Sequence, residues 1–180
     1  MAMQKTAMSI SEFAQYVELP ENAERRLELI DGEVVEMAPG RTWFSGVGKI
    51  LTYRVYAFCD SHNLPCYVSG GDGDYDIGGH VICPDFAYKT TPLSKDYPDP
   101  APPLWAVEVI SPTDKARDIR RKRQIYQEAG ILLWEMYDTV QRVDVYAPGQ
   151  PVREFGIDDT LDGGDVLPDF RLAVNELFAE

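Results

Sequence analysis

The stretch that decides the fold is Leu104-Trp-Ala-Val-Glu-Val-Ile110, an almost wholly apolar run of seven residues. A continuous apolar run of this kind is typical of a central strand that is covered on both faces of a sheet. One carboxylate, Glu108, lies inside the run. Burying an ionised carboxylate costs several kcal/mol unless a partner compensates its charge. Either a structural ion pair or a metal site would supply that compensation, and Glu108 alone favours neither.

The residues that follow this strand predict a helix. Ser111 is expected to be the N-cap, with Pro112 at the first helical position and Asp114 completing a pattern like a capping box. The helix should run to about Glu128 and stop at Gly130, because glycine accepts the positive φ that follows many helices.

Further elements are expected on both sides of this strand and helix. Asp31-Gly32 between two β-rich runs predicts a tight hairpin turn. The other expectations are a short helix that opens at Ser9 or Ser11, a hairpin over 26–37, a helix over 43–60, strands over 65–69, 81–88, 131–137 and 142–146, and a final helix around 174–178. The Gly- and Asp-rich segment 70–76 is expected to form a solvated turn, and the Pro-rich segment 89–103 a loop. This order predicts one α/β domain over residues 1–180, with a mixed β-sheet flanked by helices.

Composition excludes several classes of protein. The chain has 180 residues and a formal net charge of −13, which argues against non-specific coating of nucleic acid or of anionic membranes. Its three cysteines and two histidines provide little material for a disulfide framework or a zinc site. No stretch approaches the roughly 20 apolar residues of a membrane span, and no signal peptide is evident. We therefore expect a soluble, cytoplasmic protein without a membrane partner.

The charge is unevenly spread. Six of the 17 basic residues lie within 115–123, where Asp118 is the only acid, so this window carries +5 and the rest of the chain −18. A solvated helix face is the common explanation of such a run. Here the expected helix begins close to Glu108, and its N-terminal dipole would favour a nearby phosphate. Asp118, Lys122 and Tyr126 are spaced by four residues and so share one face of that helix.

A second carboxylate points to a metal site. Asp85 follows Pro84 directly and interrupts another apolar strand. Two neighbouring strands that bring Asp85 and Glu108 together would create a repulsion that a divalent cation relieves, and carboxylate oxygens suit Mg²⁺ or Mn²⁺. An ordinary aspartate at a strand end is the alternative for Asp85 taken alone.

Several motifs, in order along the chain, resemble one family. They are Leu27-Glu-Leu-Ile-Asp-Gly-Glu33, Pro84-Asp85, Val107-Glu-Val-Ile-Ser-Pro112 followed by Asp118, Lys122, Tyr126 and Gly130, and Asp162-Gly-Gly-Asp-Val-Leu-Pro168. Over nearly its whole length the chain resembles the Uma-type restriction endonuclease family of bacteria, a branch of the PD-(D/E)XK nuclease superfamily. Two positions depart from the pattern. Ile110 stands where the superfamily has a lysine, and Phe44 or Ser45 stands where relatives often have a histidine, so no catalytic histidine is assigned.

The resemblance implies a restriction endonuclease-like core and a set of site residues. Asp85 and Glu108, with the Val109 carbonyl, would hold one Mg²⁺ or Mn²⁺, and Glu28 would complete the acidic shell or hold a second ion. Lys122 would take over the lysine function, orienting the attacking water or stabilising the transition state. Asp118 and Tyr126 would position Lys122 and the phosphate. The structural alternatives are a solvated strand residue for Glu28 and core packing for Tyr126.

Three functions follow from these residues. The first is a metal-dependent endonuclease acting on DNA, possible as a homodimer because duplex cleavage needs two sites. The second is a non-catalytic binding or assembly module on the nuclease fold, which the acidic surface favours. The third is a hydrolase for another phosphodiester, such as RNA or a nucleotide.

Overall fold

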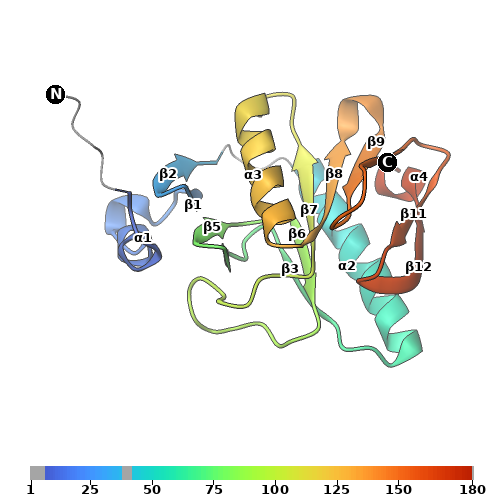
Figure 1. Cartoon of the computed structure of the whole chain (residues 1–180), viewed down its shortest axis with the longest axis horizontal. Helices are drawn as coiled ribbons and strands as arrows, with labels where there is room; N and C mark the ends of the chain where they lie inside the picture. Colours follow the sequence, from blue (N-terminus) through green and yellow to red (C-terminus); the bar gives the residue numbers. More distant parts are fainter. Residues whose placement is uncertain (1–6, 38–41, 180) are drawn as a thin grey trace.

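The fold is built on a mixed six-stranded sheet. The computed structural model describes residues 7–37 and 42–179 (Figure 1). The strands of this sheet are β3 (Tyr67–Gly70), β6 (Phe86–Lys89), β7 (Trp105–Ile110), β8 (Leu132–Tyr137), β9 (Arg142–Tyr146) and β10 (Arg153–Phe155), in the order β10-β9-β8-β7-β6-β3. β7 and β8 run parallel, and the other neighbours are antiparallel. The predicted α/β class with a mixed sheet is confirmed.

The two long helices cover opposite faces of this sheet. Trp105, Val107 and Val109 of β7 pack in the core that includes α2 (Thr42–His62), while Ala106 packs with α3 (Ala116–Glu128). Because side chains alternate along a strand, Glu108 shares the face of Ala106. Figure 1 shows α2 and α3 on the two sides of the sheet. The predicted central strand is confirmed, and its carboxylate points towards α3.

Both helices follow from their apolar spacing. Val47, Leu51, Val55 and Cys59 recur every four residues and form the buried stripe of α2, which begins and ends within two residues of the predicted 43–60. On α3, Ile125 forms part of the buried face. Within 7–37 and 42–179, no helix is both long and apolar enough to cross a bilayer.

A smaller sheet lies beside the main one. It consists of β1 (Leu27–Ile30), β2 (Glu33–Glu36), β4 (Tyr75–Ile77) and β5 (His80–Ile82), in the order β2-β1-β5-β4. The predicted hairpin is confirmed, with φ of 51° at Asp31 and 73° at Gly32, which two-residue hairpin turns require. The helix α1 (Ile10–Val17) covers this sheet, with Phe13 among its buried side chains, and Ser9 is its N-cap as expected.

The chain between 70 and 88 changes sheets, which the sequence did not predict. The strand expected over 81–88 is divided into β5 and β6, which belong to different sheets. Pro84 at the division has no N–H with which to continue a strand ladder. The expected solvated turn over 70–76 was wrong in part, because Tyr75 begins β4 and is buried. The break leaves Asp85 where the two sheets meet.

The helix after β7 begins later than expected. Its N-cap is Lys115 and its first residue Ala116, so the prediction of Ser111 as N-cap was wrong. The Asp114 carboxylate instead accepts the Ser111 N–H at 2.8 Å and closes a turn ahead of the helix. The end at Glu128 is confirmed, and Gly130 has φ of 70°.

The last 34 residues contain more strand than expected. Besides β10, they form the hairpin β11 (Thr160–Gly163) and β12 (Leu167–Ala173), followed by α4 (Val174–Leu177) close to the predicted final helix. Short 3₁₀ turns occupy Pro20–Asn22 and Asp138–Val140. The hairpin buries Leu161, Leu167 and Leu172 in the α2 core, a long-range contact that local patterns do not reveal.

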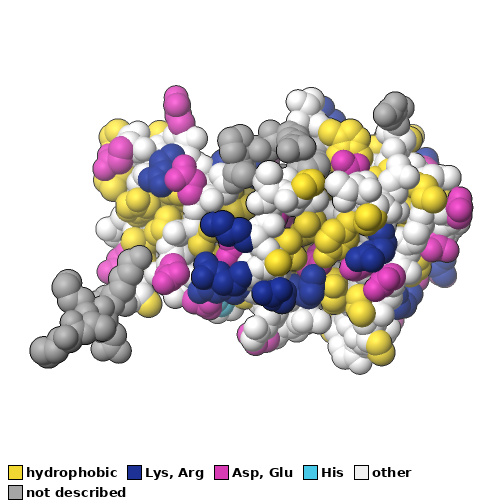
Figure 2. Space-filling view, turned by 90° about the horizontal axis from the view of Figure 1, so that it is seen from above, with side chains coloured by type: hydrophobic (Ala, Val, Ile, Leu, Met, Phe, Trp, Pro, Cys, Tyr) yellow, Lys and Arg dark blue, Asp and Glu magenta, His cyan; other side chains and the backbone are white. Residues whose placement is uncertain are grey.

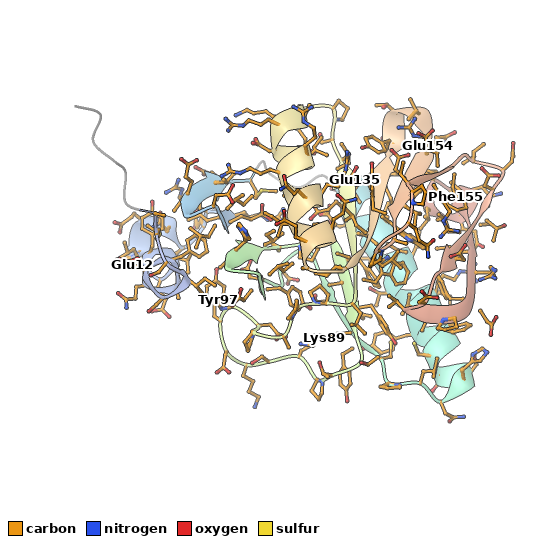
Figure 3. The ribbon with its side chains drawn as sticks, in the orientation of Figure 1. Glu12, Lys89, Tyr97, Glu135, Glu154 and Phe155 are labelled. Carbon is orange, nitrogen blue, oxygen red and sulfur yellow. The ribbon has the colours of Figure 1, made fainter. Side chains whose placement is uncertain are left out.

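The Pro-rich loop is confirmed and is attached to the sheet by one buried ion pair. Lys89 Nζ lies 2.8 Å from Asp99 Oδ2 and also donates to the Ala101 carbonyl at 3.0 Å. Figure 3 shows Lys89 at the base of this loop and Tyr97 further along it. Since Lys89 is only 1% exposed, the pair holds the loop against the protein.

Candidate active site

The predicted site residues line one cavity. Its volume is about 610 Å³, and it lies beside α3, where β1 and β7 meet the junction of the two sheets. All seven predicted residues contribute to its walls, namely Glu28, Asp85, Glu108, Val109, Asp118, Lys122 and Tyr126. Residues separated by almost a hundred positions in sequence are thus brought to one place by the fold.

Two strands, one helix and one link position the site side chains. Glu28 lies on β1, Glu108 on β7, and Lys122 and Tyr126 lie one turn apart on α3. Asp85 belongs to the short link between β5 and β6. Because β7 is central and α3 packs on its face, Glu108 and the α3 residues have fixed positions.

A buried lysine connects two buried carboxylates. Lys122 Nζ lies 3.0 Å from Glu28 Oε1 and 2.9 Å from Glu108 Oε1. Glu28 is fully buried, and Lys122 and Glu108 are 8% and 9% exposed. Tyr126 donates its hydroxyl proton to the same Glu108 oxygen at 2.5 Å. Glu28 is therefore no solvated strand residue, and Tyr126 is buried while also donating to the site.

Two backbone N–H groups also donate to carboxylates of the site. The Val109 N–H donates to Asp85 Oδ2 at 2.8 Å, which ties Asp85 to the residue after Glu108. The Cys83 N–H donates to Glu28 Oε1 at 3.0 Å. Glu28 Oε2 is buried and has no hydrogen-bond partner among the residues described. An unpaired buried oxygen is costly, and it is a position that a water or a cation would satisfy.

The site carries more negative than positive charge. Burial, together with the charges of Asp85 and Glu28, raises the pKa of Glu108 to about 7 against the opposing effect of Lys122. Burial also raises the pKa of Asp85. For Lys122 burial disfavours the charged form, but Glu108 and Glu28 outweigh it and raise its pKa, so the lysine stays charged. Lys122 and Arg26 are two cations among three carboxylates, which leaves a deficit of positive charge when all three are ionised.

The donors suit a hard divalent cation. Carboxylate oxygens with a backbone carbonyl are the ligands that Mg²⁺ and Mn²⁺ take, and Asp85, Glu108 and Val109 offer them. No group of three or more His, Cys, Asp or Glu side chains is arranged as a metal site in the described part of the chain. Glu28 Oε1 already accepts from Lys122 and the Cys83 N–H, so its unpaired Oε2 is the atom that Glu28 can offer to an ion.

The basic run of α3 divides into paired and exposed residues. Lys122 faces the site, Arg121 pairs with Asp31, and Arg123 forms two hydrogen bonds to Glu135, at 2.8 and 2.5 Å. Three others lie exposed near the start of the helix, namely Lys115, Arg117 and Arg120. Asp118 is half-buried and pairs with Arg117 at 3.3 Å.

Arg26 and Glu135 are among the charged residues of the cavity that were not predicted as site residues. Arg26 lines it and donates to the Gly71 carbonyl at 2.7 Å. Glu135 lies opposite Glu108 in the β7–β8 register and is 2% exposed (labelled in Figure 3). Glu135 gives the same signal as Glu108, a lone carboxylate inside an apolar strand, so it could have been found. Arg26 has no such signal.

Comparison with known proteins shows the fold and the family of the chain. A crystal structure described as "a putative nuclease belonging to DUF820", from Anabaena variabilis ATCC 29413, has the same fold, with a TM-score of 0.77 and 17% sequence identity over 95% of this chain and 97% of that one. The family model Uma2, described as "Putative restriction endonuclease", matches residues 13–175. The chain belongs to the Uma2 family, as the motifs predicted. A search of curated proteins finds no match.

Proposed function

We propose that this protein is a metal-dependent endonuclease that hydrolyses phosphodiester bonds of DNA. The observation that carries the proposal is the buried Lys122 held between Glu28 and Glu108, in a cavity that Asp85 also lines. A structural ion pair needs one partner for each charge. This arrangement has three carboxylates for two cations, Lys122 and Arg26, and so favours a site that binds a further cation.

The chain's own residues would act in distinct ways. Asp85 and Glu108, with the Val109 carbonyl, would hold Mg²⁺ or Mn²⁺, and the Val109 N–H and the Tyr126 hydroxyl fix the two carboxylates. A bound ion would supply Lewis-acid stabilisation of the phosphate and activate the attacking water. Lys122 would place its charge near the oxygens on which negative charge develops. Glu28 would keep Lys122 protonated and aligned.

Asp118 has a smaller proposed role. Asp118 is half-buried in the cavity wall, one turn before Lys122 on α3. It pairs with Arg117 and would orient the phosphate through that residue. We retain the homodimer and the cytoplasmic location as predictions, the dimer because cutting both strands of a duplex takes two sites.

Two isosteric variants test the proposal. Glu108→Gln and Asp85→Asn should each reduce Mg²⁺- or Mn²⁺-dependent nicking of plasmid DNA by at least about a hundredfold, because each removes an anionic ligand. Glu21→Gln, at an exposed position outside the cavity, is the matched control and should cleave like the native protein. Circular dichroism checks that all three variants fold.

The alternatives predict other results. Unchanged cleavage by both variants would refute the site. A native protein that binds Mn²⁺ neither calorimetrically nor in cleavage assays would support a binding or assembly module. Preferential cleavage of RNA or of a nucleotide diester with Mn²⁺ would redirect the proposal to another phosphodiester.

A further inference from the structure

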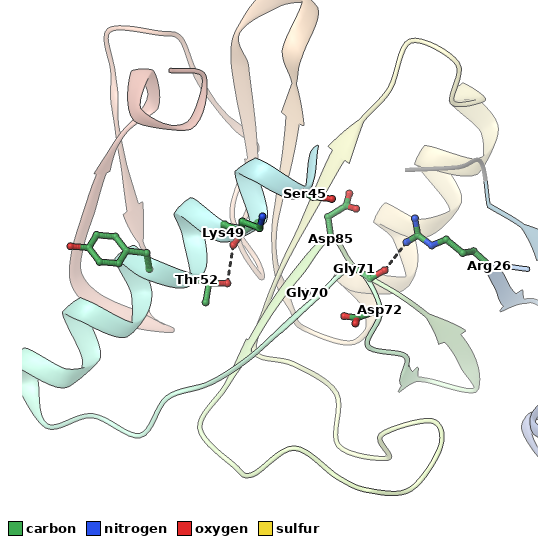
Figure 4. Close-up of a pocket in the computed structure, with 10 residues that line it drawn as sticks. Arg26, Ser45, Lys49, Thr52, Gly70, Gly71, Asp72 and Asp85 are labelled. Atoms are coloured by element: carbon green, nitrogen blue, oxygen red, sulfur yellow. Dashed lines mark hydrogen bonds between the residues drawn. The ribbon is translucent and has the colours of Figure 1, made fainter. Parts of the chain in front are cut away.

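A second cavity adjoins the first at Asp85. Its volume is about 590 Å³, and it lies between the first half of α2 and the end of β3. It shares Arg26 and Asp85 with the catalytic cavity and is otherwise lined by Ser45, Gly48, Lys49, Thr52, Tyr53, Gly70, Gly71 and Asp72. In Figure 4, α2 with Ser45 and Lys49 lies on one side of Asp85, and Gly71 with Arg26 lies on the other. Asp85 thus stands between two open spaces.

Two glycines lie against Asp85, where the two cavities adjoin. A Cβ at Gly48 would lie 3.3 Å from the Asp85 carbonyl oxygen, and one at Gly71 would lie 3.4 Å from Asp85 Oδ1. A side chain at Gly48 would press on the Asp85 backbone, and one at Gly71 would reach the edge of ordinary contact with its carboxylate. The lack of side chains at both positions lets α2 and the segment after β3 approach Asp85 closely from two sides.

The second cavity has a cation without a partner. Lys49 is exposed, and it forms no ion pair or hydrogen bond with any residue in the described ranges. Arg26 is fixed at the junction by its bond to the Gly71 carbonyl. Asp72 is the acidic residue of this cavity besides Asp85, and in Figure 4 it lies beyond Gly71, away from Ser45 and Lys49. An anion would therefore be favoured on the α2 side.

We infer that this second cavity binds the DNA phosphate next to the one that is cleaved, with Lys49 as its main contact and Arg26 at the junction. The inference rests on the proposed function. A polymer cleaved beside Asp85 must continue in both directions from the scissile phosphate, and the second cavity lies directly beside Asp85 on the α2 side. Lys49 would act on binding and not on the chemical step, because it lies outside the cavity of Lys122 and Glu108.

The test compares two substrates and two lysines. Lys49→Gln should raise KM for an oligonucleotide about fivefold with kcat unchanged. It should also reduce the slope of log KM against log salt concentration by about one in magnitude. It should not change hydrolysis of bis(4-nitrophenyl) phosphate, a diester with no neighbouring phosphate. Lys95→Gln, an exposed lysine of the Pro-rich loop, is the control and should match the native protein on both substrates.

The outcomes separate this inference from the proposed function. Equal KM values for the two lysine variants would overturn the inference, and so would an equal loss on the small diester. If the native protein cleaves neither substrate, the proposed function fails. The inference is then decided by fluorescence anisotropy of the oligonucleotide in EDTA, where Lys49→Gln should bind about fivefold more weakly than Lys95→Gln and equal binding would refute it.

Discussion

Lys122 explains how Glu108 tolerates burial in a central strand. From sequence, an ion pair and a metal site were both open as reasons for that carboxylate. The ion pair is present, since Lys122 Nζ lies 2.9 Å from Glu108 Oε1, but Lys122 is shared with Glu28. A lysine shared by two buried carboxylates lowers the cost of burying both without neutralising either.

Removing Lys122 should lower both the stability of the fold and the cleavage activity, and a second substitution should restore part of the stability alone. Lys122→Met leaves Glu28 and Glu108 buried without a cation and should lower the free energy of unfolding by about 3–5 kcal/mol. Adding Glu28→Gln removes one uncompensated charge, so the double variant should recover part of that loss in urea titrations. Neither variant should cleave DNA, because the charge proposed for the transition state is absent. Recovery of cleavage in the double variant would contradict the role of Lys122.

Metal affinity should depend on the protonation of Glu108. Its pKa, raised by burial to about 7, means that the folded protein holds a proton there well above the usual carboxyl range. Below that pKa a proton on Glu108 competes with the cation, so Mn²⁺ affinity should fall about tenfold for each pH unit by which the pH is lowered. Above that pKa the affinity should stay constant. Calorimetric titration on both sides of pH 7 measures this. Glu108→Gln should bind weakly with a shallower pH dependence, and a flat profile in the native protein would exclude Glu108 as a ligand.

At the scale of elements, α3 is held in place by the residue next to Lys122. Arg123 reaches β8, where it bonds Glu135 at 2.8 and 2.5 Å, and its guanidinium lies 4.5 Å from the centre of the Tyr146 ring. Glu135 faces Glu108 in the neighbouring strand. The pair therefore fixes the rotation of α3 that directs Lys122 into the site.

Loosening this attachment should lower turnover more than binding. Arg123→Ala should reduce kcat by about ten- to a hundredfold with little change in KM, because Lys122 would lose its alignment while phosphate contacts persist. Arg123→Lys should recover only part of the rate, since it cannot form both hydrogen bonds. Gln127→Ala, at an exposed position of the same helix with no proposed role, is the control. A loss confined to KM would show that Arg123 contacts substrate instead.

Elements with strong local signals could be predicted from the sequence. The hairpin turn at Asp31-Gly32, the four-residue repeat of α2 and the apolar run of β7 each depend on nearby residues, and all three are confirmed. The division of 81–88 into β5 and β6 was not foreseen, because sheet membership depends on distant partners. The same applies to the hairpin β11–β12. Near the site, the start of α3 was misplaced because Asp114 favours a turn with Ser111 over a helical cap.

At the scale of the whole molecule, the surface limits how DNA is approached. The net charge of −13 repels phosphate at long range. Figure 2 views the end of the molecule at which β7 ends and α3 begins, and basic side chains gather across its middle. Since Arg121 and Arg123 are paired with Asp31 and Glu135, the +5 of the 115–123 window overstates the charge available to a ligand.

This division of charges predicts weak binding with a small salt slope. If the exposed Lys115, Arg117 and Arg120 meet phosphates together with Lys49, about four counterions are released, and log KM against log salt should have a slope of magnitude about 3–4. Replacing the three α3 residues by glutamine should lower that magnitude by about 2–3. Cleavage rates over a range of KCl concentrations measure both slopes. An unaltered slope in the triple variant would mean that DNA approaches by a face other than the one where α3 begins, since Lys49 alone accounts for only about one of those contacts.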